Sequence, residues 1–285
     1  MTIEKELQLR SRALRVRERI VQTTAEGGCF IGSALSCTDL LVYLYGEVLR
    51  TTPEMRNDAR RDYFFFSKGH AVPALYGTLA ECGYFPPSML DRHLQETSSI
   101  YWHPHRAIPG VEFHAGSLGH LPSVALGVAY DARSSGGGNR IFVLLGDGEL
   151  NEGSVWESVL LASAYALDNL TFIIDRNKFQ ANARTDDIVP LEPLENKFDA
   201  FGWACRRIDG HDFHAMEDAF RRPSPFPGKP YLVIADTVRG KGIPGIESRS
   251  DRWFMSLSRN EMAVLLEELR ASHPSLTPAE PVGKR

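Results

Sequence analysis

Asp147 is flanked by Gly146 and Gly148 directly after the apolar run RIFVLL (140–145). Such a run is typical of a buried strand, and residues 154–167 have the pattern of a helix. Glycines let the backbone turn sharply and let a ligand approach it closely. The positive end of the following helix would point at the same place, which favours an anionic ligand. Taken alone, the GDG triplet is equally typical of a tight strand-to-helix turn.

Asn177 makes the pattern more specific. It follows a second apolar run, LTFIID (170–175), which is also expected to be a buried strand. A right-handed crossover between parallel strands brings Asp147 and Asn177 to the same edge of the sheet, where ligands bind in open α/β folds. Carboxylate and amide oxygens suit Mg²⁺, which usually shares its coordination shell with phosphates. The two residues therefore predict a magnesium–diphosphate site.

The elements that must position these residues alternate along the chain. Helices are expected over 5–24, 37–49, 72–83, 122–133 and 154–167, and strands over 62–66, 140–145, 170–175 and 231–236. The glycine-rich stretch GGCFIGSALS (27–36) is expected to be a loop. Near-continuous apolar strands between helices predict an α/β fold, a parallel sheet covered by helices on both faces. We expect one domain over 1–272 and a flexible tail over 273–285.

The composition is that of an ordinary globular protein. The chain has 285 residues, of which 43% are hydrophobic and 24% charged, and its formal net charge is -4. This charge does not favour nucleic acid or an anionic membrane as a partner, and no apolar run is long enough for a membrane span. The four cysteines are scattered without a CxxC pair, which favours a reducing, cytoplasmic location.

Several segments resemble one family of cofactor enzymes. GDG followed by Asn177 resembles the thiamine diphosphate fingerprint, and four further segments resemble the transketolases in the right order: FFFSKGH (64–70), WHPHRAIPGVEFHAGSLGH (102–120), FDAFGWACRRIDGHD (198–212) and ADTVRGKGIPGIE (235–247). The resemblance covers about residues 10–250, whereas a full-length transketolase is more than twice as long as this chain. It therefore implies the diphosphate-binding (PP-type) subunit of a split transketolase-like enzyme.

The resemblance implies roles for individual residues. Asp147, Asn177 and the backbone carbonyl of Phe179 would bind Mg²⁺, or Ca²⁺ or Mn²⁺ in its place. The cofactor thiamine diphosphate would lie against Ser67, His70, His103, Gly116, Ser117, Leu118, Gly146, Asp147, Gly148, Glu149 and Asn177. Catalytic roles are implied for His70, His103, Glu152 and Glu157, the two glutamates through a carboxylate network across a subunit interface.

Each of these side chains also has a simpler interpretation. His70 could be a histidine at the start of a helix, and His103 a histidine in a surface loop. Glu152 and Glu157 could merely complement the dipole of a helix that begins beside them.

Three positions depart from the family. Phe30 stands where transketolases have a histidine in the first glycine-rich loop, Phe254 stands near a second such histidine, and His120 replaces a glutamine. Both missing histidines bind sugar oxygens in the family. Buried hydroxyls without partners cost about 1–3 kcal/mol each, so we expect a less polar substrate, such as a small 2-oxo acid. Alternatively, His120 or the partner restores the lost contacts, and ordinary ketol transfer survives.

Three functions remain open from the sequence. The first is a subunit that transfers a two-carbon ketol or acyl unit with a small-molecule substrate. It would pair with a C-terminal, pyrimidine-binding subunit in an α₂β₂ assembly. The second is a component of a decarboxylating 2-oxo acid dehydrogenase, which passes an acyl unit to a carrier thiol. The third is a non-catalytic cofactor-binding subunit, although the intact pair of Asp147 and Asn177 argues against it.

Overall fold

The computed structural model describes residues 1–220 and 227–276. Within these residues five parallel strands form one sheet in the order β1-β2-β3-β7-β6. The strands are β1 (Tyr63–Phe66), β2 (Ile141–Gly146), β3 (Leu170–Arg176), β6 (Ala204–Asp209) and β7 (Tyr231–Asp236). A small antiparallel hairpin, β4 (Phe179–Gln180) and β5 (Ala183–Arg184), follows β3. The predicted parallel sheet is thus confirmed.

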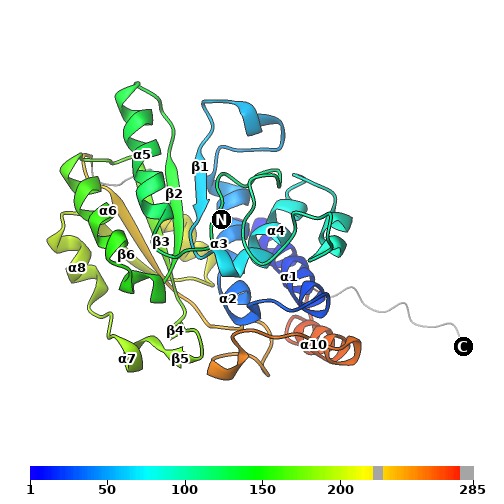
Figure 1. Ribbon diagram of the computed structural model, residues 1–285. Coiled ribbons are helices and arrows are strands. Elements are labelled where there is room, and N and C mark those ends of the chain that lie inside the picture. Colours follow the sequence, from blue (N-terminus) through cyan, green and yellow to red (C-terminus); the bar gives the residue numbers. More distant parts are fainter. Residues whose placement is uncertain (221–226, 277–285) are drawn as a thin grey trace, which may run out of the picture.

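Helices cover both faces of the sheet (Figure 1). One face packs against α1 (Ile3–Ala25), α2 (Ile31–Ser36), α3 (Thr38–Tyr43), α4 (Val72–Glu81), α9 (Phe213–Phe220) and α10 (Arg259–Ala271). The other face packs against α5 (Leu121–Ser134), α6 (Gly153–Ala164) and α8 (Leu194–Ala200). Shorter helical segments connect these elements: Leu44–Val48, Glu54–Asn57, Gly69–Ala71, Pro87–Arg92, Gly148–Asn151, α7 (Thr185–Ile188) and Ser250–Arg252.

The alternation of side chains along the strands creates two separate cores. In β2, Phe142 and Leu144 belong to the core under α1–α4, whereas Val143 and Leu145 belong to the core under α5 and α6. Because successive side chains point to opposite faces of a strand, a fully apolar strand serves both cores at once. This burial on both sides explains the near-continuous apolar runs in the sequence.

Two expectations from the sequence were wrong in detail. Residues 31–36, expected as loop, form the buried helix α2, because a run of small and apolar residues follows the paired glycines that end at Gly28. Strand β6 was not expected, since Arg206 and Arg207 are exposed at this edge of the sheet and break its apolar pattern. Of the predicted tail, residues 277–285 lie outside the described residues.

No helix in the described part of the chain is both long and apolar enough to cross a membrane.

Candidate functional site

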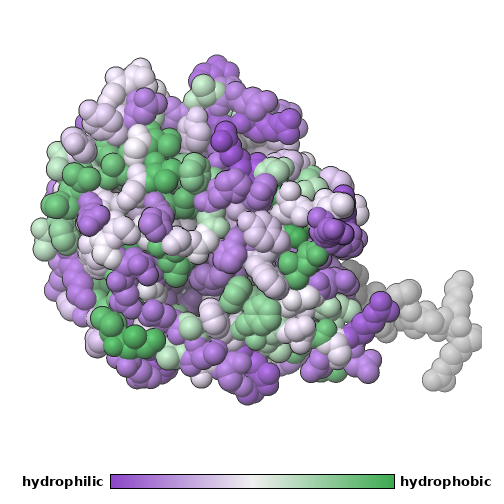
Figure 2. All heavy atoms as spheres, in the orientation of Figure 1, coloured by the Kyte–Doolittle hydropathy of each residue, from purple (hydrophilic) through white to green (hydrophobic). Residues whose placement is uncertain are grey.

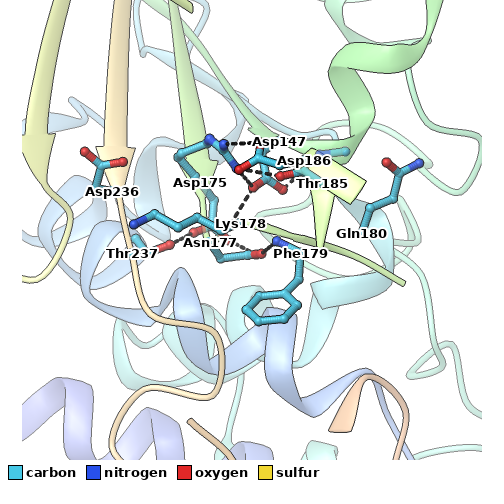
Figure 3. Close-up of polar contacts among 12 residues, drawn as sticks. Asp147, Asp175, Asn177, Lys178, Phe179, Gln180, Thr185, Asp186, Asp236 and Thr237 are labelled. Atoms are coloured by element: carbon cyan, nitrogen blue, oxygen red, sulfur yellow. Dashed lines mark hydrogen bonds and ion pairs between the residues drawn. The ribbon is translucent and has the colours of Figure 1, made fainter. Parts of the chain in front are cut away.

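Asp147 and Asn177 lie together at the carboxyl edge of the sheet (Figure 3). Strands β2 and β3 pair with Gly146 opposite Asp175, so the residues that follow each strand meet at this edge. The carboxylate of Asp147 accepts a hydrogen bond from the backbone nitrogen of Lys178 at 2.7 Å. The crossover predicted from the sequence therefore brings the two side chains together.

The glycines beside Asp147 have separate roles. At Gly148 a Cβ would lie 2.8 Å from Cγ of Gln180, so a larger residue would collide with that side chain. At Gly146 a Cβ would meet only Cβ of Lys68 at 3.8 Å, so this glycine leaves room in front of the strand. Neither glycine has a positive φ. Glycine is therefore needed at this turn because neighbouring groups come close to the backbone, and not because the backbone is left-handed.

A cavity of about 340 Å³ opens at this edge. Most of the residues singled out from the sequence line it: Phe30, His70, His103, Gly116, Leu118, Gly146, Asp147, Gly148, Glu149, Asn177 and Phe179. Ser33, Lys68, Gln180, Ala181 and Trp253 complete the wall. A cavity of this size with convergent polar groups is typical of a small-molecule site.

Charge inside the cavity is distributed unevenly. Burial and the nearby carboxylate of Asp175 raise the pKa of Asp147 to about 6, against the lowering effect of Arg176. Arg176 donates to Asp147 at 3.0 Å. Desolvation, together with the charge of Lys68, lowers the pKa of His70 to about 3. At neutral pH, His70 is therefore an uncharged ring, able to donate or accept a hydrogen bond but not to supply positive charge.

The donors around Asp147 fit a hard divalent cation. Asp147, Asn177 and Phe179 all line the cavity and offer carboxylate, amide and backbone carbonyl oxygens. The raised pKa of Asp147 reflects a buried charge that a bound cation would relieve. Asn177 already accepts a hydrogen bond at Oδ1 from the backbone nitrogen of Phe179 at 3.0 Å, which leaves a second lone pair on that oxygen.

Glu149 ties three segments of the cavity wall together. Its carboxylate accepts hydrogen bonds from the backbone nitrogens of Gly119 at 2.9 Å and Gly146 at 3.2 Å, and from the hydroxyl of Ser67. Burial raises its pKa. Ser67 is itself buried, and its hydroxyl is used by Glu149 rather than turned to the cavity wall. Glu149 thus fixes the ends of β1 and β2 against the loop that precedes α5.

Aromatic rings form one side of the cavity. The centroid of Phe30 lies 4.9 Å from that of Trp253, 5.1 Å from Phe254 and 5.6 Å from His70. Trp253, not Phe254, lines the cavity, while Phe254 packs against Phe30 and remains 40% exposed. Trp102 extends the cluster outward through Phe254, with centroids 6.2 Å apart.

Four other predicted residues lie away from the cavity wall. Ser117 is exposed in the loop before α5, and His120 is exposed directly before the first residue of that helix. Glu152 directly precedes α6, and Glu157 lies on that helix; both are exposed. On the same helix, Leu160 and Leu161 are also exposed.

The structure adds three cationic residues that sequence reasoning missed. Lys68 is buried and paired with Asp175, and Arg176 is paired with Asp147. Arg239 is 1% exposed, and in the part of the chain that is described its Nε and Nη2 have no hydrogen-bond partner. Lys68 and Arg239 both lie inside segments that resemble transketolases (64–70 and 235–247), and this position could have drawn attention to them.

Arg239 lies just behind the cavity wall. Its Nη1 donates to the carbonyl oxygen of Ala181 at 2.6 Å, and its guanidinium stacks over Phe179 at 5.1 Å from the ring centroid. Burial lowers its pKa to about 10, although the carboxylate of Asp147 opposes this. Lys68 and Arg176 are each paired with a carboxylate, whereas Arg239 forms no ion pair with a described residue, so its charge would favour an anionic ligand.

The fold and this cavity define an α/β protein with a polar cavity at the carboxyl edge of a parallel sheet. Residues 9–276 match the family described as "Transketolase, thiamine diphosphate binding domain". The chain belongs to the transketolase family.

Two relatives are themselves single subunits of about this length. An apulose-4-phosphate transketolase subunit from Actinobacillus succinogenes is 39% identical over 268 residues, covering 93% of this chain and 96% of the relative. A 6-deoxy-6-sulfo-D-fructose transketolase subunit from Clostridium sp. is 33% identical over 268 residues, covering 93% and 98%. The transketolase of Homo sapiens is 32% identical, and there the match covers 92% of this chain but 42% of the relative.

Solved structures agree with the fold. The transketolase of Campylobacter jejuni superimposes with a TM-score of 0.84 and 25% identity, covering 97% of this chain and 46% of that one. The transketolase of Leishmania mexicana gives a TM-score of 0.82 at 22% identity, which shows the fold alone, and the match covers 94% of this chain and 44% of that one. This chain therefore spans less than half of a full-length transketolase.

Proposed function

We propose that this chain is the diphosphate- and Mg²⁺-binding subunit of a two-subunit, thiamine diphosphate-dependent enzyme that transfers a two-carbon ketol or acyl unit. The observation that carries the proposal is the convergence of Asp147, Asn177 and Phe179 on one cavity, beside the buried cation Lys68. When bound, the cofactor supplies the carbanion chemistry of the reaction.

The residues of this chain would bind the metal ion and the cofactor and orient the substrate. Asp147, Asn177 and the carbonyl of Phe179 would hold Mg²⁺, which neutralises the diphosphate. Arg239 behind the wall and Lys68 in the wall would add positive charge, that of Lys68 partly offset by Asp175, and low solvent access would strengthen the attraction for an anion. His70 and His103 have pKa values lowered by desolvation, so both are neutral rings that can exchange a proton or hydrogen bond with a substrate oxygen.

A partner chain is part of the proposal. Helices α5 and α6 and the turn after α6 present exposed apolar side chains, Tyr130, Leu160, Leu161 and Tyr165, and Figure 2 shows hydrophobic surface gathered over these two helices. Exposed apolar patches rimmed by polar residues often mark contacts with another protein. We assign this face to contacts in an α₂β₂ assembly with a pyrimidine-binding subunit, in which Glu152 and Glu157 would meet carboxylates of the neighbouring chain. Several relatives are named as single subunits of a transketolase, which supports a split enzyme.

The substrate is proposed to be non-standard. Phe30 and Trp253 give the cavity an apolar wall where family members bind sugar oxygens with histidines, which favours a less polar group at that point. Two relatives are named for unusual sugars, which supports a specialised reaction rather than ordinary pentose phosphate exchange.

Calorimetric titration tests the proposal. The chain, co-purified with the protein encoded beside its gene, is titrated with thiamine diphosphate in the presence and absence of Mg²⁺. We expect saturable, Mg²⁺-dependent binding that is lost in Asp147→Ala and kept in the matched control Asp187→Ala, an exposed aspartate outside the cavity wall. Binding that is independent of Mg²⁺ or survives Asp147→Ala would contradict the assignment. Binding without turnover of ketoses or 2-oxo acids would favour a non-catalytic role.

A further inference from the structure

A second cavity, of about 290 Å³, lies at the far end of β1 from the cofactor cavity. Its wall comes from the segment between α3 and β1, from Tyr84 after α4, and from the loop 106–112. It shares no lining residue with the cavity around Asp147. In Figure 2 hydrophilic side chains gather above β1, over the part of the chain that includes the 54–57 segment.

The floor of this second cavity is an ion pair. Arg61 Nη2 donates to Glu112 Oε2 at 2.7 Å, and a second, parallel bond joins the same two groups. Nε of Arg61 is also used, because it donates to the carbonyl of Arg56 at 3.0 Å. Burial raises the pKa of Glu112, while Arg61 and Arg106 oppose that effect. The single carboxylate of the cavity is therefore already neutralised.

The rim carries two arginines whose side chains form no ion pair with a described residue. Arg56 and Arg106 both line the cavity and are exposed, and neither guanidinium has a hydrogen bond or ion pair within residues 1–220 and 227–276. Three arginines against one glutamate leave two positive charges. The hydroxyls of Tyr84 and Thr51 lie 3.1 Å apart on the same wall and can each form one more hydrogen bond.

We propose that this cavity binds a small organic phosphate, with Arg56 and Arg106 holding the phosphate and the hydroxyls of Thr51 and Tyr84 binding the carbon skeleton. A guanidinium matches the geometry of a phosphate through paired N–H donors, and two free guanidiniums balance a dianion. The volume is at the lower end of ligand cavities, which limits the ligand to a few carbons.

The site also has a direct connection to the cofactor cavity. The loop 106–112 runs between His103 and Gly116, and both of these residues line the cofactor cavity. A phosphate held by Arg106 would therefore restrain a segment whose two ends belong to the proposed active site.

Calorimetry on the full chain tests this site with glycerol 3-phosphate, inorganic phosphate and glycerol as probes. We expect saturable binding of glycerol 3-phosphate, weaker binding of inorganic phosphate and none of glycerol. The double variant Arg56→Gln/Arg106→Gln should weaken binding about tenfold or more, since each lost charged hydrogen bond removes affinity. Neither guanidinium has a hydrogen bond or ion pair to the described residues, so the variant should melt like the native chain.

Arg60→Gln is the matched control, because Arg60 is in the same segment, is 88% exposed and pairs with Asp58 outside the cavity. The Arg60→Gln variant should bind glycerol 3-phosphate as tightly as the native chain does. The proposal is overturned if the native chain shows no saturable binding at roughly 10 mM probe. It is also overturned if the double variant binds as well as the native chain, which would place the phosphate in the cofactor cavity. Equal affinity for inorganic phosphate and glycerol 3-phosphate would overturn the assignment to an organic phosphate.

Discussion

The ammonium of Lys68 forms an ion pair with the carboxylate of Asp175, although 107 residues separate them in the sequence. Both side chains are buried, one after β1 and the other in β3, with β2 between the two strands. Burial acts to raise the pKa of Asp175, but the charge of Lys68 and the hydrogen bonds from Ser36 and Thr237 keep it below its ordinary value. The pair therefore fixes the strand ends that carry the cofactor cavity.

Lys68→Met should destabilise the chain by about 3–5 kcal/mol, because it leaves the buried carboxylate of Asp175 without its cation. Denaturant unfolding followed by circular dichroism measures the loss. Lys5→Met is the control, since Lys5 forms an ion pair with Glu47 while 46% exposed, and its loss should cost at most about 1 kcal/mol. Equal losses in the two variants would show that the buried pair has no special role.

Binding of Mg²⁺ with thiamine diphosphate should weaken as the pH falls below about 6, the pKa of Asp147, because the metal needs the deprotonated carboxylate. The expected slope is about tenfold in affinity per pH unit below 6, with a plateau above it. The folding stability of the chain without ligand has the opposite dependence on pH. The pKa is raised from 3.8, so this group's contribution to stability decreases as the pH rises between 3.8 and about 6.

Titrations of the native complex between pH 5 and 8 measure this dependence, and a chelator should abolish binding. The Asp147→Asn variant should bind Mg²⁺ and thiamine diphosphate weakly, and its affinity should not change with pH in this way. The Asp187→Asn variant should behave as the native chain. A slope that persists in Asp147→Asn would assign the titration to another group.

Phe30→His should shift specificity toward polar ketoses. The new ring would place a hydrogen-bond partner in the cavity wall beside His70, where the native ring contributes only apolar surface. We expect the ratio of kcat/KM for a ketose phosphate to that for a 2-oxo acid to rise about tenfold in the assembled enzyme. Phe113→His, at a phenylalanine 43% exposed outside the cavity wall, is the control. An unchanged ratio would mean that Phe30 does not determine the substrate.

Leu161→Asp should prevent assembly with the partner chain, because it places a charge in the exposed apolar face of α5 and α6. Size-exclusion chromatography with light scattering distinguishes the complex from the single chain. Val264→Asp introduces the same charge at a residue that is 62% exposed on α10, and it should leave assembly intact. Normal assembly of the Leu161 variant would exclude this face as the interface.

Sequence patterns predicted most of the fold because burial on both faces leaves a strong signal. Strands β2, β3 and β7 are nearly continuous apolar runs, and each was predicted within one residue of its observed bounds. Edge strand β6 was missed, since its exposed arginines match no strand pattern. Asp147 and Asn177 could be placed together because parallel topology fixes which strand ends are neighbours.

Glu152 and Glu157 were expected at a subunit interface, and with both exposed at α6 that role stays a prediction. Their spacing in the sequence is the same whether they line a cavity or an outer helix face, and the structure places both on the exposed surface at α6. Phe254 and Trp253 differ by a single position, and only the path of the backbone decides that Trp253 reaches the cavity.

The sequence by itself determined the α/β class and the resemblance to transketolases, because hydrophobic period and short motifs are local properties. It also determined the meeting of Asp147 with Asn177, because the parallel crossover that these patterns indicate makes the two strand ends neighbours. Tertiary structure decided the pairing of Lys68 with Asp175, the position of Arg239 behind the cavity wall with no ion pair to a described residue, and the two arginines on the rim of the second cavity. These depend on contacts between segments far apart in the chain. No local pattern encodes which charges folding will pair and which it will leave without a partner.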